Sequence, residues 1–415
     1  MPKILQPLTL LLLGGYIYSL ILRGTLSNFA DEQAGVLVLA SAIVLLLMAA
    51  AYLQPQDDTQ TRPKNSSLKL LFALLPIIVG GLITETAVVP NTAAIVYLSW
   101  DSNDNLQLFK ASAAGQAEPQ QLTQLQPTQQ VTNFSVSPDG QLIAYTVQNA
   151  DRSSNIWTID RDGTLPYPVL DCLSAACSHP VWSPDGTRIM YERRPVDLPG
   201  SPRLWWLDPI SGESIPVFND ANLLGYGAQF SPNGRWFSFL NPLDQEILIY
   251  DLETTTIKTI PSQTGEIGAW HPSADYFYFT DVQYLGSIVA THIFQADVLT
   301  GEQGGLTNVM AAVNDGSITW SPNGRYLAFG RQPTRVASGK QLWLISADGT
   351  DPFQLTDLPT INHGRPTWSP DSQEIAYQAF DTTQPSSDPS IWVIEITSGR
   401  ARLIAPVGIM PQWLP

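Results

Sequence analysis

The chain has 415 residues, with 37 acidic and 21 basic side chains and a formal net charge of −16 at pH 7. The first 90 residues hold five basic and five acidic side chains, so the remainder carries the whole net charge. Such an acidic domain stays soluble and repels phosphate backbones, which excludes a nucleic-acid-binding protein. The length allows several domains or one large all-β domain.

Three apolar stretches, residues 4–22, 34–53 and 68–84, precede residue 90. The first two are long enough to cross a bilayer as helices and contain no charged side chain. The third is shorter, with Pro76 inside it, and we also interpret it as a span. A cleaved signal peptide is the alternative for the first stretch, although no cleavage-site pattern follows it. We therefore expect residues 1–90 to be an α-helical membrane anchor with about three transmembrane helices.

The basic residues near these stretches predict the orientation of the anchor. Lys3 precedes the first stretch, and Arg62, Lys64 and Lys69 lie between the second and the third, whereas only Arg23 lies between the first and the second. Loops rich in Lys and Arg stay on the cytoplasmic side. We therefore expect a multi-pass protein of the plasma membrane, with its N-terminus in the cytoplasm and everything after residue 90 on the periplasmic or extracellular side.

Two cysteines, Cys172 and Cys177, lie in one loop that reads "DCLSAACSH". In an oxidising compartment a local disulfide is expected, and two free thiols are the alternative. A structural zinc site needs four ligands, and only His179 lies close by in the sequence. We expect no metal at this loop.

One motif recurs after residue 90: a large apolar residue, then Ser-Pro-Asp-Gly or a close variant, then an apolar strand. Its prolines, spaced 40 to 50 residues apart, are Pro138, Pro184, Pro232, Pro272, Pro322, Pro370 and Pro415. Near Trp320 one unit contains the expected strands "ITW", "RYLAFG", "KQLWLIS" and "PFQLT", with turns "SPNG" and "ADGT" between them. Proline presets φ for such a turn, and Gly or Asn accepts positive φ. Four antiparallel strands per unit predict the blade of a β-propeller.

The turns "WSPDG" at Trp182, "WSPNG" at Trp320 and "WSPDS" at Trp368 resemble the repeat of TolB-like propellers, which are WD-repeat-like proteins. The resemblance covers roughly residues 92–415. It implies an all-β propeller that binds other proteins in the envelope of a bacterium, and it makes the expected membrane a bacterial inner membrane. The chain departs from the motif at Val136, at Phe230 and in "HPSAD", where no glycine follows.

The two ends of the repeat region predict how the ring closes. Residues 93–124 supply strands two, three and four of a unit, and the final "MPQWLP" supplies only a first strand. Together with six continuous units they make seven blades, closed by pairing of the C-terminal strand with the N-terminal blade, whereas TolB itself has six. Two sets of tryptophans are expected to pack between blades: first-strand Trp182, Trp270, Trp320, Trp368 and Trp413, and third-strand Trp157, Trp206, Trp343 and Trp392.

The loops after strands two and four share one face of the predicted propeller and differ from unit to unit, so we call it the variable-loop face. The turns after strands one and three share the opposite face, the short-turn face. Variable loops on a rigid scaffold usually carry the binding function, so a protein partner is expected there. Polar residues at the entry of the inner strands are expected to converge at the channel mouth on this face, as a ligand pocket; these are His179, Tyr226, Glu266, Asp315, His363 and Arg365.

No hydrolase, metalloprotease, phosphate-loop or dinucleotide motif occurs in the sequence. We therefore expect a membrane-anchored, non-catalytic interaction scaffold with no cofactor, no bound metal and no nucleic-acid partner. A small-molecule or glycan sensor that binds at the channel mouth is the main alternative. A propeller-type hydrolase or lactonase is the other, and it would need His179 and His363 to form a metal site with Glu266 and Asp315.

Overall fold

The computed structural model describes residues 93–415 apart from residues 116, 198, 199, 245, 273, 274, 337 and 385. The chain divides into two compact units, residues 1–88 and 89–415, and the described residues belong to the second. Every regular element among the described residues is a β-strand. Within this part no helix is long and apolar enough to cross a bilayer, and the three predicted spans, 4–22, 34–53 and 68–84, lie outside it.

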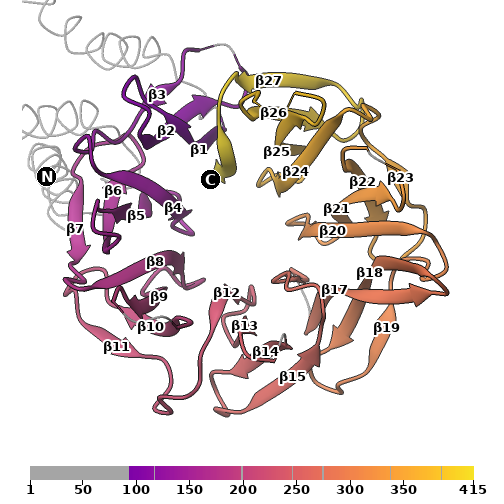
Figure 1. Cartoon of the computed structure of the whole chain (residues 1–415), viewed down its shortest axis with the longest axis horizontal. Coiled ribbons are helices and arrows are strands. Elements are labelled where there is room, and N and C mark those ends of the chain that lie inside the picture. Colours follow the sequence, from indigo (N-terminus) through magenta and orange to yellow (C-terminus); the bar gives the residue numbers. More distant parts are fainter. Residues whose placement is uncertain are drawn as a thin grey trace, which may run out of the picture. The chain divides into compact units, whose positions relative to one another are not determined.

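The strands follow one another around a central channel (Figure 1). The first sheet has the order β28 (Ile409–Leu414), β1 (Ala94–Trp100), β2 (Leu106–Ser112), β3 (Gln120–Gln121). The second contains β4 (Gln130–Val136), β5 (Leu142–Gln148), β6 (Ser154–Asp160), β7 (Tyr167–Leu170), β8 (Ala175–Trp182), β9 (Ile189–Pro195), β10 (Arg203–Leu207) and β11 (Ser214–Pro216). The third contains β12 (Tyr226–Phe230), β13 (Trp236–Asn241), β14 (Glu246–Asp251) and β15 (Ile257–Pro261).

The fourth sheet contains β16 (Ala269–Trp270), β17 (Tyr276–Leu285), β18 (Ile288–Asp297), β19 (Gln303–Gly305), β20 (Val313–Trp320), β21 (Tyr326–Pro333), β22 (Gln341–Ser346) and β23 (Phe353–Gln354). The fifth contains β24 (Ile361–Trp368), β25 (Glu374–Asp381), β26 (Ser390–Glu395) and β27 (Ala401–Ala405). Within each four-strand unit consecutive strands pair antiparallel, and we call the first strand of a unit its inner strand. Figure 1 shows the inner strands β4, β8, β12, β20 and β24 nearest the channel.

The first sheet joins the two ends of the described chain. Strand β28 pairs antiparallel with β1, so that Leu414 lies opposite Ala94 and Trp413 opposite Ile95. A second contact holds the same ends together, because the Arg402 guanidinium donates to the carbonyl of Ala113 at 2.6 Å and to both carboxylate oxygens of Glu374. Residues more than 280 positions apart therefore share one sheet, and β1 has no free edge at this point.

The recurring Ser-Pro-Asp-Gly turn is stabilised by its own side chains. In the turns that contain the serine, its hydroxyl donates to the carboxylate or amide oxygen two residues later, as in Ser183 to Asp185 at 2.5 Å and Ser321 to Asn323 at 2.9 Å. This hydrogen bond lowers the pKa of Asp185. Gly186 follows with φ of 70°, a left-handed conformation that glycine adopts without strain. The motif recurs because each unit needs the same reversal after its inner strand.

The tryptophans of these turns connect neighbouring units. Their indole Nε1 groups donate to a backbone carbonyl in the inner strand of the preceding unit. These bonds are Trp182 to Ser135 at 3.2 Å, Trp270 to Gln229 at 3.2 Å, Trp368 to Thr319 at 3.2 Å and Trp413 to Thr367 at 2.9 Å. Trp320 is buried to the same degree, but its Nε1 has no hydrogen-bond partner among the described residues.

Among the predicted third-strand tryptophans, Trp206 packs against the neighbouring unit as expected but lies one position out of register with the other three. In the strand register Trp157, Trp343 and Trp392 lie opposite an aromatic residue of strand two, and Trp205 holds this position in the unit of β8 to β11. Trp206, its neighbour, lies on the opposite side of the strand, with its ring 5.6 Å from that of Phe230. Successive side chains of a strand point to opposite faces of the sheet. Trp205 and Trp206 therefore contact different neighbouring elements.

We expect Trp368→Phe to lower the free energy of unfolding by about 1 kcal/mol more than Trp320→Phe does. Both changes remove a similar amount of buried aromatic surface, but only Trp368 loses a hydrogen bond to the neighbouring unit. Urea unfolding of the two variants and the parent measures this difference. Equal losses in the two variants would mean that the indole hydrogen bonds do not hold the units together.

Candidate functional site

A repeated bulge determines which side chains of the inner strands face the channel. The register shifts by one residue within β8, β12, β20 and β24. At each bulge one residue adopts a left-handed conformation; these residues are His179, Gly227, Ser317 and Arg365, with Met410 in β28. A bulge of this kind redirects the side chains on either side of it.

Most of these bulge residues are fixed by an acceptor from the preceding unit. Their backbone N–H groups donate to a side-chain oxygen: His179 to Asn133 at 2.8 Å, Gly227 to Glu192 at 2.8 Å, Ser317 to Glu266 at 3.0 Å and Met410 to Gln378 at 3.1 Å. Glu266, a predicted ligand residue, therefore has one carboxylate oxygen occupied by the backbone. Its position is explained by this contact between neighbouring units.

Two predicted ligand residues, Asp315 and His363, lie inside the protein and not at the channel mouth. The Asp315 carboxylate is buried and accepts hydrogen bonds from the Arg331 guanidinium at 2.6 and 2.9 Å. The ring of His363 is buried against Tyr377, and its Nδ1 donates to the carbonyl of Lys340 at 3.1 Å. Burial lowers the pKa of His363, which keeps the ring neutral.

His179 is the predicted residue that forms a contact at the channel entry. Its Nδ1 lies 3.3 Å from the Glu192 carboxylate, whose other oxygen accepts from Gly227 N–H. The hydrogen bond to Glu192 raises the pKa of His179, and the charge of Arg365 offsets part of this effect. Tyr226 is half-buried and packs against the apolar core. The six predicted residues do not converge on one pocket, and no group of three metal-ligating side chains occurs in the described part of the chain.

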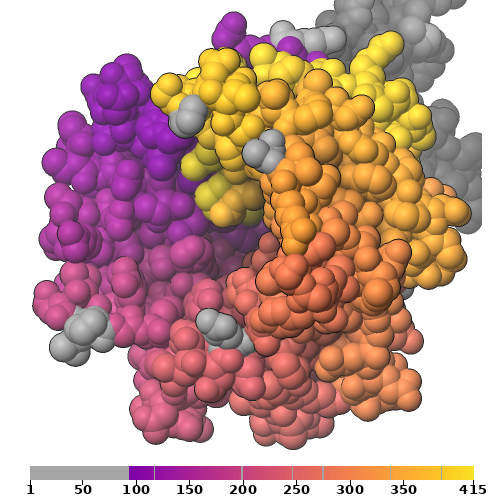
Figure 2. Space-filling view, turned by 45° about the vertical axis from the view of Figure 1, so that its right-hand side comes forward, coloured from indigo at the N-terminus to yellow at the C-terminus, as the bar shows by residue number. Residues whose placement is uncertain are grey.

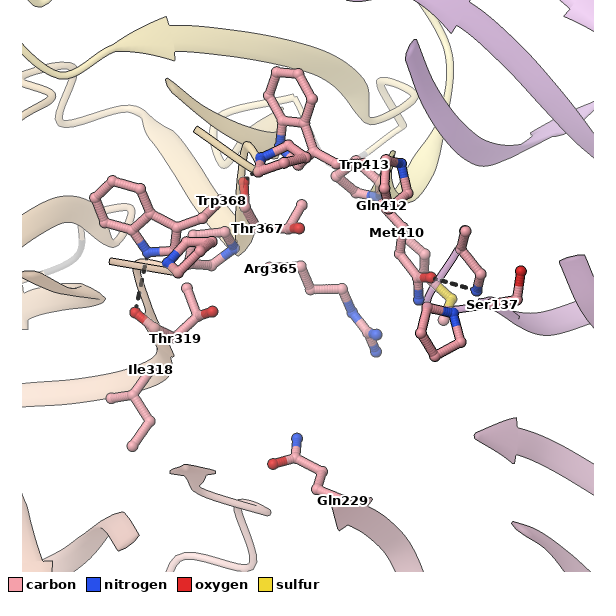
Figure 3. A pocket seen from close by; sticks show the side chains of 17 residues that line it. Ser137, Gln229, Ile318, Thr319, Arg365, Thr367, Trp368, Met410, Gln412 and Trp413 are labelled. Carbon is pink, nitrogen blue, oxygen red and sulfur yellow. Dashed lines mark hydrogen bonds between the residues drawn. The ribbon is translucent and has the colours of Figure 1, made fainter. Parts of the chain in front are cut away.

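The sixth predicted residue, Arg365, lines a different cavity. This cavity of about 760 Å³ lies at the short-turn end of the channel, where Pro138, Pro322 and Pro370 of the recurring turns form part of its wall. Figure 3 shows the Arg365 side chain extending into the open space between Met410 and Gln229. The surface is visibly hollowed beside the C-terminal segment (Figure 2).

The charge of Arg365 is not neutralised by the part of the protein that the structure describes. No hydrogen bond or ion pair of its side chain is found among the described residues, and it is exposed to the cavity. The other described side chains that line the cavity are uncharged, among them Gln229, Thr319 and Gln412. An unpaired guanidinium in a concave site recognises carboxylate or phosphate groups, often through two parallel hydrogen bonds.

On the variable-loop face, one hairpin extends further than the others. Strands β17 and β18 have ten residues each, and their turn at Gly286 carries Tyr284 and Val289 opposite each other. These side chains are 69% and 56% exposed. Loop residue Arg335 donates to the hydroxyl of Ser287 at 3.1 Å and so fixes the turn. The sequence contained a signal for this hairpin, because apolar residues continue through "VQYLGSIVA" beyond the usual strand length.

The two cysteines are joined in the structure by a disulfide, with their α-carbons 6.2 Å apart. Cys172 lies in the loop after β7, and Cys177 lies in β8, where its carbonyl accepts from the hydroxyl of Ser154 at 2.8 Å. The disulfide therefore fixes the variable-face loop 171–177 at the point where two neighbouring units meet.

No protein-family model and no curated protein sequence matches the chain. Similar solved structures include TolB from Acinetobacter baumannii, 16% identical over 82% of this chain and 71% of that one, with a TM-score of 0.49. An oligogalacturonate lyase in complex with manganese is 14% identical over 75% of this chain and 85% of that one, with a TM-score of 0.54. The β-propeller domain of the Trilobed protease from Pyrococcus furiosus is 14% identical over 66% of this chain and 84% of that one, with a TM-score of 0.51. The likeness to this propeller domain confirms the expected β-propeller fold, and a fold by itself does not determine function.

We expect His179→Gln to destabilise the protein below about pH 6.5 and to have little effect at alkaline pH. The folded pKa of His179 is raised by Glu192, so the contribution of the protonated ring is complete below the unfolded pKa. It is lost as the pH rises through the folded pKa. Because the side chain is 57% exposed, the effect stays below about 1 kcal/mol. Urea unfolding midpoints across this pH range measure it, and a difference independent of pH would contradict the assignment.

Proposed function

We propose that the protein is a non-catalytic scaffold that binds a protein partner through its variable-loop face. The observation that carries this proposal is the protruding β17–β18 hairpin with its exposed Tyr284 and Val289. Exposed aromatic side chains on a fixed scaffold are typical of the residues that contribute most to protein binding. The hairpin turn is fixed by Arg335, so little conformational entropy is lost when a partner packs against it.

The free edge of this hairpin supports the same proposal. Strand β16 pairs only with Phe277 and Tyr278 of β17, and β18 covers the other side. Among the described strands, none pairs with β17 beyond Tyr278 on the side where β16 lies. Residues 262–264 contact β17 there through two hydroxyl groups that donate to the Thr280 carbonyl and through the Gln263 N–H, which donates to the Asp281 carboxylate. The Val282 N–H donates to the Asp281 carboxylate, so the part of β17 that presents apolar side chains and backbone groups to a partner runs from Gln283 to Leu285.

We also propose a seven-bladed ring that is held at a bacterial inner membrane by residues 1–90. Two features support the blade number. Each eight-stranded sheet divides at a single parallel pair, Ser154 with Ala176 and Thr291 with Asn314, and the halves repeat the four-strand pattern of the other sheets. The membrane location rests on the three apolar stretches and the distribution of basic residues in the sequence. A disulfide agrees with a propeller on the periplasmic or extracellular side.

We expect the double variant Tyr284→Ser with Val289→Ser to lose its protein partner. The full chain and the variant are purified in mild detergent, and the copurifying proteins are quantified by mass spectrometry. Burial of an anchoring aromatic makes a loss of at least about ten-fold the expected result. Ile210→Ser is the matched control, since Ile210 is 92% exposed in a turn of the short-turn face. A partner retained by the double variant, or lost equally from the control, would contradict the proposal.

The cavity at Arg365 favours a second function, the sensing of an anionic small molecule or glycan in the channel. One unpaired cation surrounded by uncharged polar and apolar side chains fits a single carboxylate on a sugar-sized ligand. A lyase that acts on an oligogalacturonate is among the proteins of the same fold. A uronic acid disaccharide is therefore a suitable first probe.

For this second function we expect digalacturonate to bind at least about ten-fold more tightly than the neutral digalactose, because only the acid pairs with Arg365. Arg365→Gln should abolish this preference, whereas Arg335→Gln, which removes a cation outside the cavity, should preserve it. Calorimetric titration of the full chain measures both. Equal affinity for the two sugars, or a preference that survives in Arg365→Gln, would rule out anion recognition at this residue.

A further inference from the structure

A second cavity, which we call the aromatic pocket, lies at the variable-loop end of strands β24, β25 and β26. Its volume is about 420 Å³, and Tyr377 and Trp392 form its aromatic wall. The small side chains of Ala379 and Ser390 lie beside these rings, and the loop after β25 contributes Asp388. Of the six residues that the sequence predicted at the channel mouth, only His363 lines this pocket, on its inner side.

The equivalent position in two other units is filled by an arginine. Strand register places Tyr377 opposite Trp392, just as it places Phe329 opposite Trp343 and Tyr191 opposite Trp205. Two residues further along strand two, these units have Ala379, Arg331 and Arg193, respectively. In the unit of Trp157 the same place is taken by the buried Val147. Ala379 is therefore the smallest residue at this position among the units with such a tryptophan.

Both arginines place their guanidinium groups over aromatic rings. The Arg331 guanidinium lies 5.0 Å from the ring centres of both Phe329 and Trp343, and it pairs with Asp315. The Arg193 guanidinium lies 4.9 Å from the ring centre of Trp205. A cation over an aromatic face is attracted by the negative charge of the ring surface. The fold thus contains two occupied examples of a guanidinium site at this place in a unit.

In the last unit the aromatic wall is kept but the cation is missing. Ala379 and Ser390 stand where Arg331 and Gln341 stand in the preceding unit, and they leave the pocket open. A carboxylate is still present, because Asp388 borders the pocket and has no hydrogen bond or ion pair among the described residues. No described basic residue other than the neutral His363 lines it.

We propose that the aromatic pocket binds a small molecule that carries a guanidinium group. The guanidinium would lie over Trp392 and Tyr377, in the place that Arg331 and Arg193 occupy in their own units, and Asp388 would supply the negative charge. The aromatic wall suits a planar, weakly hydrated cation better than a compact, strongly hydrated ammonium. This site is independent of the hairpin and of the cavity at Arg365.

The test titrates the full chain in mild detergent with ethylguanidinium and, in parallel, with the neutral ethylurea of the same shape. We expect ethylguanidinium to bind at least about ten-fold more tightly, since only the cation interacts with the rings and with Asp388. Asp388→Asn should weaken its binding by about three- to five-fold, and added salt should reduce this difference. Equal binding of the two compounds, or no binding of either, would overturn the proposal.

Ala379→Arg gives the most direct control, because it builds into this unit the arginine that two other units already have. We expect this variant to lose ethylguanidinium binding, whereas Ala379→Ser, which leaves the pocket open, keeps it. Thermal unfolding shows whether each variant is folded. Binding that survives in folded Ala379→Arg would place the ligand elsewhere and overturn the proposal. If Ala379→Arg does not fold, the comparison of ethylurea with ethylguanidinium and the Asp388→Asn variant still decide it.

Discussion

The structure depends on hydrogen bonds that the inner strand of one unit makes with the neighbouring unit. Backbone ladders hold each four-strand unit together, but most neighbouring units have no ladder between them. Indole N–H groups such as that of Trp368, and bulge N–H groups such as that of Gly227, supply the missing polar contacts. Burying these donors without partners costs stability, so most units present an acceptor to the next, with the Trp320 indole as an exception among the described residues. The pairing of β28 with β1 is a ladder within the first sheet, and it joins the two ends of the described chain.

The sequence was sufficient for the fold because its signals are local and repeated. The serine-proline turns, the alternating strands and the spacing of 40 to 50 residues each follow from backbone chemistry that neighbours determine. The site was not predictable in the same way. Asp315 and His363 were expected at the channel mouth because each precedes its tryptophan, Trp320 or Trp368, by the same number of residues. In each strand, however, a bulge lies between the polar residue and the tryptophan. A bulge inserts one residue and reverses the alternation of faces, so both side chains enter the blade.

Charge connects the fold to the proposed sites. In a domain with a large negative net charge, most of the arginines that matter for packing have internal acceptors, such as Asp315 for Arg331 and Glu374 for Arg402. Two places lack this pairing of a cation with an acceptor, each for the opposite reason. Arg365 is a cation without an acceptor in the channel, and the aromatic pocket is a cation site without a cation. Each departure favours a ligand that restores the pattern, an anion in the first place and a guanidinium in the second.

The central claim is that contacts between the two chain ends complete the ring, and amide hydrogen exchange of the full chain tests it most directly. The account predicts that residues 94–100 and 409–414 exchange as slowly as the strands of an internal unit such as β12 to β15, because their amides lie in one paired sheet. Fast exchange of both segments, with slow exchange elsewhere, would contradict the account. It would show that the ring is open at this point and that the C-terminal strand is not part of the stable fold.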